Sequence, residues 1–389
     1  MTQSEKWPVR ALKDVADLDR TSVSSADIRR GTLYVGLQHM TGDGGFVGVE
    51  TVANGDLSSN KFRFDERHVL YGKLRPYLRK IASPGFAGVC STEIIPILPR
   101  DGLDRRYLMH FLRQPYMVDF ATKRSAGANL PRISPKEVAK FRIPVPPLSE
   151  QRRIAAILDR ADEIRRKRQQ AIEFTGELLR SVFLNMFGDP MTNSKRLPLS
   201  TFGEELVDST YGPRFYNEPY SESGTRIIRI TDLNEAGELE FEAMPRHDLD
   251  DSVLAKSAVI PGDVIFARTG ATVGKTALMD DAAPTCVPGA YFIRLRFSER
   301  ILPAFARDTL ASPPIQQHIA VKSRQSAQQN FSGPAIRRLP ISVPPMELQL
   351  RYVAIRQRVL EIRRRQQRAE AHANELLESL SQKAFAGEL

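Results

Sequence analysis

The sequence predicts a mixed α/β protein in which two globular α+β halves, related by pseudo-two-fold symmetry, are joined by two long antiparallel coiled-coil helices. Three observations lead to this fold class. The chain contains an internal repeat, it has two proline-free stretches with heptad spacing of apolar residues, and each half holds short apolar runs broken by Gly and Pro. At 389 residues the chain is long enough for more than one domain.

The repeat is clearest at a proline-rich segment. The IPVPP segment at residues 143–147 reappears as ISVPP at residues 341–345, which is 198 residues later. The same spacing relates Gln151 to Gln349 and Phe187 to Phe385. Weaker similarities at slightly different spacings connect the bodies of the two halves. The chain therefore contains an internal duplication, and the two copies are more alike at their ends than in their bodies.

Each repeated end is predicted to form a long helix. Prolines up to Pro147 exclude a helix before Leu148, Ser149 is a favourable N-cap, and Glu150 suits the helix dipole. Apolar residues then recur every seven positions, which predicts a pairing seam. The seam residues are Ile157, Ile164, Ala171 and Leu178 in the first helix, and Ile355, Ile362, Ala369 and Leu376 in the second.

An antiparallel intramolecular pair is the simplest arrangement of these helices. A dimerisation stalk, or packing of each helix on its own half, remains an alternative. The arginine runs at residues 165–168 and 363–365 are interleaved with acidic residues, which is typical of a solvated helix face. The expected division is residues 1–147, 148–190, 191–345 and 346–389. We expect strands at residues 32–37, 68–71, 93–98, 225–230, 264–267 and 291–297, and helices at 105–120 and 302–321.

The composition favours a polyanionic partner and excludes several other classes. The net charge is +10 and the pI about 9.6, and a basic surface attracts nucleic acid. The two cysteines, Cys90 and Cys286, form no CxxC pair, and the six histidines lack metal-ligand spacing, so no zinc site is expected. With no signal peptide and no membrane-length apolar run, the protein is expected to be cytoplasmic.

Two motifs come close to catalytic signatures and fail. Residues 270–276, GATVGKT, resemble a phosphate-binding loop but have three rather than four residues between the glycines, so we expect a turn between two strands. Residues 312–315, SPPI, lack the aromatic residue of the amino-methyltransferase signature, and no glycine-rich cofactor loop accompanies them. We therefore expect no catalytic residues and no metal site in this chain.

The chain strongly resembles the specificity subunits of type I restriction-modification enzymes. The resemblance is carried by residues 141–151 (FRIPVPPLSEQ), 71–78 (YGKLRPYL), 266–275 (FARTGATVGK) and 384–389 (AFAGEL). It implies two target-recognition domains, residues 1–147 and 191–345, each reading one half of a bipartite, asymmetric DNA target. It also implies that the two spacer helices fix the unread gap and dock two methyltransferase subunits, which a motor-nuclease subunit joins. S-adenosylmethionine, ATP and Mg²⁺ are then expected on those partners, and no cofactor in this non-catalytic chain.

Candidate DNA contacts are Lys and Arg for phosphates and polar or aromatic loop residues for bases. They are Lys73, Arg75, Arg79, Lys123 and Arg124 in the first half, and Tyr211, Arg214, Arg268, Thr269, Lys275, Arg324, Gln328 and Asn330 in the second. Two other functions remain open: the recognition subunit of a type IIB-like restriction enzyme, and a coiled-coil scaffold that does not bind DNA.

Overall fold

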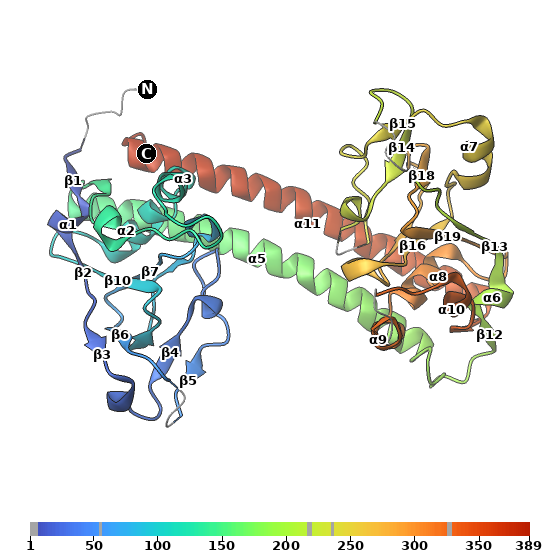
Figure 1. Cartoon of the computed structure of the whole chain (residues 1–389), viewed down its shortest axis with the longest axis horizontal. Coiled ribbons are helices and arrows are strands. Elements are labelled where there is room, and N and C mark those ends of the chain that lie inside the picture. Colours follow the sequence, from blue (N-terminus) through green and yellow to red (C-terminus); the bar gives the residue numbers. More distant parts are fainter. Residues whose placement is uncertain (1–6, 54–56, 216–219, 235–236, 325–328) are drawn as a thin grey trace. The chain divides into compact units, whose positions relative to one another are not determined.

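The computed structural model describes residues 7–53, 57–215, 220–234, 237–324 and 329–389. They form two compact units. Unit 1 contains residues 1–169 and 368–389, and unit 2 contains residues 170–367. Each unit combines a globular α/β part with parts of both long helices, α5 (Leu148–Phe187) and α11 (Met346–Ala386) (Figure 1).

Unit 1 contains three sheets, and its main core lies between the four-stranded sheet and the helices. The four-stranded antiparallel sheet has the order β2 (Ala16–Leu18), β10 (Ile94–Pro99), β7 (Val69–Gly72), β8 (Ile81–Ala82). The five-stranded mixed sheet has the order β3 (Ser22–Val23), β6 (Lys61–Phe64), β9 (Gly88–Cys90), β4 (Leu33–Val35), β5 (Glu50–Thr51). The two-stranded sheet pairs β1 (Val9–Ala11) with β11 (Arg142–Pro144). The shorter helices are α1 (Leu12–Val15), α2 (Arg105–Leu112), α3 (Pro115–Lys123) and α4 (Pro135–Val138).

Unit 2 repeats this topology. Its four-stranded antiparallel sheet has the order β13 (Leu206–Tyr211), β19 (Phe292–Phe297), β16 (Val264–Ala267), β17 (Thr276–Leu278). The second sheet has the order β15 (Arg246–His247), β14 (Thr225–Ile228), β18 (Cys286–Pro288), and β12 (Leu199–Thr201) pairs with β20 (Pro340–Ser342). The shorter helices are α6 (Phe202–Glu205), α7 (Asp251–Ser257), α8 (Pro303–Leu310), α9 (Pro313–Ser323) and α10 (Gly333–Arg337). The repeated mixed α/β architecture predicted from the sequence is confirmed; the two-fold relation between the halves stays a prediction.

The two shorter helices predicted as single elements are each broken by a proline. Residues 105–120 form α2 and α3, which restarts at Pro115, and residues 302–321 form α8 and α9, which restarts at Pro313. Proline lacks the N–H that a continuing helix needs but suits the first turn of a new one. The SPPI segment is therefore a helix start, with Ser312 at the N-cap. The glycine-rich residues 270–275 form the predicted turn between β16 and β17.

A buried glutamine fixes the start of each long helix. The side chain of Gln151 is fully buried, accepts from Asp104 N at 2.8 Å, and donates to Gly102 O and Pro146 O, both at 2.8 Å. Gln349 is also fully buried and makes the equivalent three bonds to Leu302 N, Arg300 O and Pro344 O at 2.8–2.9 Å. The predicted N-cap at Ser149 is wrong, because α5 already begins at Leu148 and Pro147 O accepts from Gln151 N.

Each long helix ends in a phenylalanine that packs into a globular core. In unit 1, the ring of Phe385, near the end of α11, lies 5.0 Å from the ring of Tyr107 and 5.5 Å from that of Phe111. In unit 2, the ring of Phe187, the last residue of α5, lies 4.6 Å from that of Phe305 and 5.3 Å from that of Tyr352. The start of one helix and the end of the other thus share a core within each unit, so the helices run antiparallel there.

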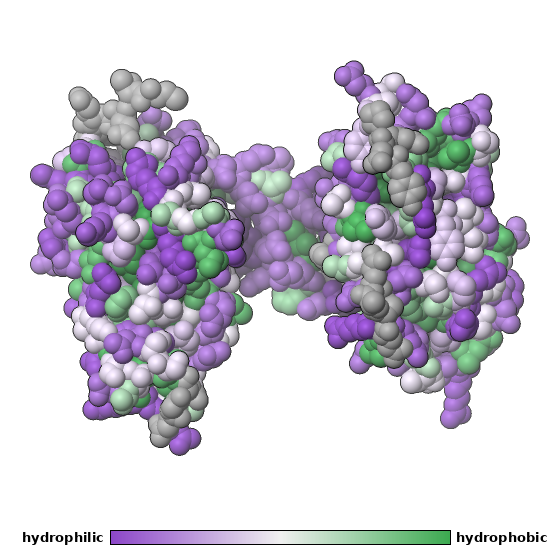
Figure 2. Space-filling view, viewed as in Figure 1, coloured by the Kyte–Doolittle hydropathy of each residue, from purple (hydrophilic) through white to green (hydrophobic). Residues whose placement is uncertain are grey.

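The predicted heptad seam needs correction. Ile164, Leu178, Ile362 and Leu376 are exposed by 44–56%, and Ile157, Ala171, Ile355 and Ala369 are only partly buried. The fully buried apolar residues of α5 in unit 1 are instead Ile154, Ala155 and Leu158, which join the globular core. A strict seven-residue row drifts around a straight α-helix, whereas the i, i+3, i+4 pattern keeps to one face. The visible surface of the helices is mainly hydrophilic, with isolated apolar patches (Figure 2).

The buried glutamines give a stability prediction. In Gln151→Glu the side chain keeps its size but loses the amide donors that meet two buried carbonyls. We expect the free energy of unfolding of unit 1 to fall by about 3 kcal/mol. Trp7, the single tryptophan, packs against the core of unit 1, so its fluorescence during denaturant unfolding reports this change.

The matched control is Gln170→Glu, the same change at an exposed position of α5, which should leave the Trp7 transition in place. An unfolding midpoint of Gln151→Glu equal to that of the unchanged protein would contradict the structural role assigned to Gln151.

Candidate nucleic-acid interface

Unit 2 contains a cleft of about 1020 Å³ at which four of the predicted contact residues meet. Arg214, Arg268, Thr269 and Asn330 all line it. Its remaining wall is rich in rings, contributed by Phe215, Tyr220, His247 and Tyr291, together with Arg229 and the ends of β14 and β18. A concave surface that combines cations, amides and exposed rings suits nucleic acid, whose parts are phosphates, polar base edges and flat bases.

The cleft owes its shape to two backbone segments that pair beside β16. Residue Thr269 forms an antiparallel bridge with Asn330. Phe331 N donates to Arg268 O at 2.8 Å, Gly270 N donates to Gln329 O at 3.0 Å, and Arg268 N donates to Tyr291 O at 2.9 Å. This pairing satisfies the backbone groups of the two segments, and residues 268, 269 and 330 line the cleft beside it.

Arg268 is held in place by an aromatic ring. Its guanidinium carbon lies 4.9 Å from the centroid of Tyr211, and Tyr211 Oη accepts a hydrogen bond from Gly333 N at 2.8 Å. Such a cation–π contact restricts the arginine without consuming its hydrogen-bond donors. In the part of the chain that the structure describes, Arg268 Nε, Thr269 Oγ1 and Asn330 Oδ1 are all buried from solvent and have no hydrogen-bond partner.

Lys275 and Arg324 are not part of the lining of this cleft. Lys275 directly precedes β17, and its carbonyl accepts from Ala267 N at 2.9 Å. Arg324 is the exposed C-cap of α9. Gln328 lies outside the described residues. A role in DNA binding stays a prediction for each of these residues.

Unit 1 repeats the same backbone pairing with different side chains. Lys73 N donates to Glu93 O and Ile133 N to Lys73 O, both at 3.0 Å, and Arg75 N donates to Pro131 O at 2.7 Å. Leu74 forms the bridge with Arg132. Matching hydrogen bonds therefore equate Lys73 with Arg268, Leu74 with Thr269, Arg132 with Asn330, and Glu93 with Tyr291.

At the equivalent positions, unit 1 pairs its two cations with a carboxylate, whereas Arg268 and Asn330 of unit 2 have the uncharged Tyr291 in its place. The carboxylate of Glu93 lies 3.9 Å from Lys73 Nζ and 3.0 Å from Arg132 Nε. Sequence reasoning selected Lys73 but missed Glu93 and Arg132. An alignment of the two halves at β10 and β19 places Glu93 opposite Tyr291 and would have identified this carboxylate.

The remaining contact candidates of unit 1 lie on two neighbouring elements. The short 3₁₀ turn Pro76–Leu78 packs against α3 and is flanked by Arg75 and Arg79. Lys123 ends α3 and pairs with Asp119 at 2.7 Å, and Arg124 lies over the ring of Phe120 at 3.4 Å. Arg79 instead turns to a second pocket, where its Nη2 donates to Arg113 O at 3.1 Å.

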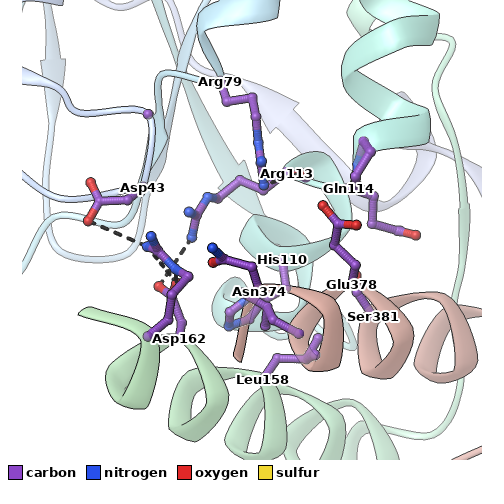
Figure 3. Close-up of a pocket in the computed structure, with 14 residues that line it drawn as sticks. Asp43, Arg79, His110, Arg113, Gln114, Leu158, Asp162, Asn374, Glu378 and Ser381 are labelled. Atoms are coloured by element: carbon purple, nitrogen blue, oxygen red, sulfur yellow. Dashed lines mark hydrogen bonds and ion pairs between the residues drawn. The ribbon is translucent and has the colours of Figure 1, made fainter. Parts of the chain in front are cut away.

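This second pocket, of about 440 Å³, is built around a buried ion cluster where α5 and α11 meet the globular part of unit 1 (Figure 3). Asp162 on α5 lies 3.5 Å from Arg113 Nη1, 2.9 Å from Arg165 Nη2 and 2.8 Å from Arg166 Nη2. Asp43 adds contacts to both helix arginines at 3.6 and 3.5 Å. The predicted solvated face is therefore wrong at Arg165 and Arg166, which tie α5 to the loop that holds Asp43.

The cluster changes the titration of its members. Burial alone would raise the pKa of Asp162, but Arg113, Arg166 and Arg165 outweigh it and hold this pKa below the ordinary carboxyl value. Burial lowers the pKa of Arg113. Because the folded-state pKa of Asp162 is depressed, its contribution to stability is present above the unfolded pKa of about 4 and is lost as pH falls through the folded value.

Among the described residues, no group of three or more His, Cys, Asp or Glu side chains is arranged to hold a metal ion. None of the described helices is both long and apolar enough to cross a membrane.

Two α/β units that repeat one topology and one pattern of loop pairing define a duplicated α/β protein. Residues 4–174 match the family model described as the type I restriction modification DNA specificity domain. The match agrees with the resemblance predicted from the sequence.

Known relatives extend the similarity beyond the first half. The chain is 27% identical over 191 residues to the EcoDI specificity subunit of Escherichia coli, covering 48% of this chain and 42% of the relative. It is 25% identical over 308 residues to the EcoKI specificity subunit of E. coli K12, covering 73% and 65%. The chain thus spans less than two thirds of the length of these two relatives.

Solved structures support the fold of the whole chain. The S subunit of a type I restriction-modification system from M. genitalium aligns with a TM-score of 0.59 at 12% identity, over 99% of this chain and 98% of that one. A chain from a structural study of complex assembly and conformational transition in the type I R-M system aligns with the same TM-score at 21% identity, over 100% of both.

The ion cluster yields a second stability prediction. Asp162→Ala removes the carboxylate that Arg113, Arg165 and Arg166 share and leaves buried guanidinium groups without compensation. We expect unit 1 to lose about 3 kcal/mol of unfolding free energy at pH 7, measured by Trp7 fluorescence in denaturant. The difference from the unchanged protein should shrink as pH falls well below 4, where Asp162 becomes protonated in both states.

Glu163→Ala is the matched control, because Glu163 neighbours Asp162 in sequence but pairs with Lys167 on the exposed face. This variant should unfold at the same denaturant concentration as the unchanged protein. Equal effects of the two substitutions would refute the assignment of Asp162 as the centre of the cluster.

Proposed function

We propose that the chain is the sequence-specific DNA-binding subunit of a type I restriction-modification complex and that each unit reads one half of a bipartite target. One observation carries the proposal. The two units repeat the same fold and the same loop pairing but present different side chains, Lys73, Leu74 and Arg132 in one and Arg268, Thr269 and Asn330 in the other. Two equivalent scaffolds that carry different side chains suit an asymmetric site with two unlike halves.

The chemistry in this proposal belongs to partner subunits. Two methyltransferase subunits would bring S-adenosylmethionine, and motor-nuclease subunits would bring ATP and Mg²⁺. This chain would contribute no catalytic group, and the helices shared by both units would set the length of the unread spacer. The names of the relatives, all specificity subunits of type I restriction enzymes, support this division of labour.

The proposal is tested by mapping methylated bases in host DNA with and without the gene for this chain. We expect a split, non-palindromic motif that disappears on deletion and returns on complementation. An unchanged methylation map would overturn the proposal.

A binding measurement separates DNA recognition from a scaffold role. The chain assembled with its methyltransferase should bind a duplex carrying the mapped motif, with an affinity that falls steeply with salt because Lys and Arg displace counterions. Duplexes in which one half of the motif is scrambled should bind more weakly by about 10²-fold or more, since each wrong base pair costs about 1–3 kcal/mol. Equal affinity for all duplexes would indicate a protein without sequence preference.

A further inference from the structure

We infer that Arg268, Thr269 and Asn330 are the base-reading residues of unit 2, that Arg268 contacts a guanine in its half-site, and that the equivalent residues of unit 1 do not read bases. This inference rests on the proposed function and names the residues and the base that the proposal leaves open. It follows from a difference between two sites that share one backbone arrangement.

Three polar side chains in one cleft have atoms whose hydrogen bonds are unmade in the free protein. Arg268 Nε, Thr269 Oγ1 and Asn330 Oδ1 are buried, line one cleft, and lack hydrogen-bond partners within the described parts of the chain. A buried polar atom without a partner costs about 1–3 kcal/mol, so three of them at one place indicate bonds that form only when a ligand is present. One N–H donor, one amide acceptor and one hydroxyl that can do either match the polar edges of bases rather than a single anion.

The Arg268 side chain is held at a defined angle. The ring of Tyr211 positions the Arg268 guanidinium, and Tyr211 is itself anchored by Gly333 N. Phosphate contacts are made by mobile cations as readily as by fixed ones, but bidentate bonds to guanine N7 and O6 need a fork held at a defined angle. An arginine fixed at its planar face and open along its N–H edge suits guanine.

The equivalent positions of unit 1 carry paired charges. There Lys73 and Arg132 occupy the places of Arg268 and Asn330, and the carboxylate of Glu93 pairs with both. In unit 2 the place of Glu93 is taken by Tyr291, which is exposed by 55% and carries no charge. A carboxylate in that position would occupy the Arg268 donors and repel DNA; its absence leaves the cleft of unit 2 open.

The test uses the chain assembled with its methyltransferase subunits, and it reads methylated motifs by sequencing substrate DNA that contains every variant of the mapped target. We expect Arg268→Ala to lose discrimination at one G·C pair of one half-site by about 5- to 100-fold while the other half-site is read as before. Arg268→Lys should behave like Arg268→Ala, because lysine keeps the charge but lacks the planar fork.

Lys73→Ala in unit 1 is the matched control, since Lys73 holds the equivalent backbone position but pairs with Glu93. It should leave the preference at every position of the motif unchanged. Thermal unfolding of each variant confirms that the chain is folded, and Thr269→Val gives a second, smaller change in the same half-site without loss of a charge.

The outcomes are separable. A uniform fall in methylation across all sequences with Arg268→Ala, restored by Arg268→Lys, would make Arg268 a phosphate contact and overturn the inference. An unchanged motif in Arg268→Ala, or a change at one position in Lys73→Ala, would also overturn it. If the unchanged chain itself supported no motif, the proposed function would fail before this inference was reached.

Discussion

The exchange of helix ends between the two halves of the sequence is the constraint on which the structure depends. The helix that follows the first globular half ends at Phe187, in the core of unit 2, and the helix that follows the second half brings Phe385 into the core of unit 1. Neither core is complete without a residue from the other repeat. Gln151 and Gln349 add a directional restraint, because each buried amide has three partners and leaves little freedom for the helix start.

Much of this could be predicted from the sequence, because the constraints involved are local and repeated. Prolines marked where the long helices begin, and the 198-residue repeat related Gln151 to Gln349. The phosphate-loop pattern at residues 270–276 is one residue short, which led to the prediction of a turn between two strands. The seam failed for a tertiary reason. Ile164 and Leu178 of the heptad row are exposed, whereas Ile154, Ala155 and Leu158 pack into the globular core of unit 1. The sequence does not show which neighbour a given face of a helix will contact.

The sequence predicted which residues belong to the site better than it predicted where their side chains lie. Sequence reasoning selected Arg214, Arg268, Thr269 and Asn330, which the fold brings to one cleft although residues far apart in the chain supply them. It grouped Arg79 with the DNA contacts, yet Arg79 turns toward Arg113 and the helices. A basic residue type indicates affinity for anions, but only the backbone path decides whether the side chain faces a groove or a neighbouring helix.

The turn after β7 in unit 1 and the equivalent turn after β16 in unit 2 share a backbone conformation but carry different residues. Arg75 and Arg79 adopt left-handed backbone conformations, with φ of 52° and 53°, where unit 2 has Gly270 and Gly274 at 71° and 93°. A non-glycine residue in this region costs roughly 1–2 kcal/mol, so unit 1 keeps two arginines at an energetic penalty that glycine avoids. The shared turn geometry is thus a property of the fold, while the side chains on it are not required by the fold. Because the helix ends, the buried glutamines and the paired backbone already determine the loop path, residues at these positions can change without loss of the scaffold.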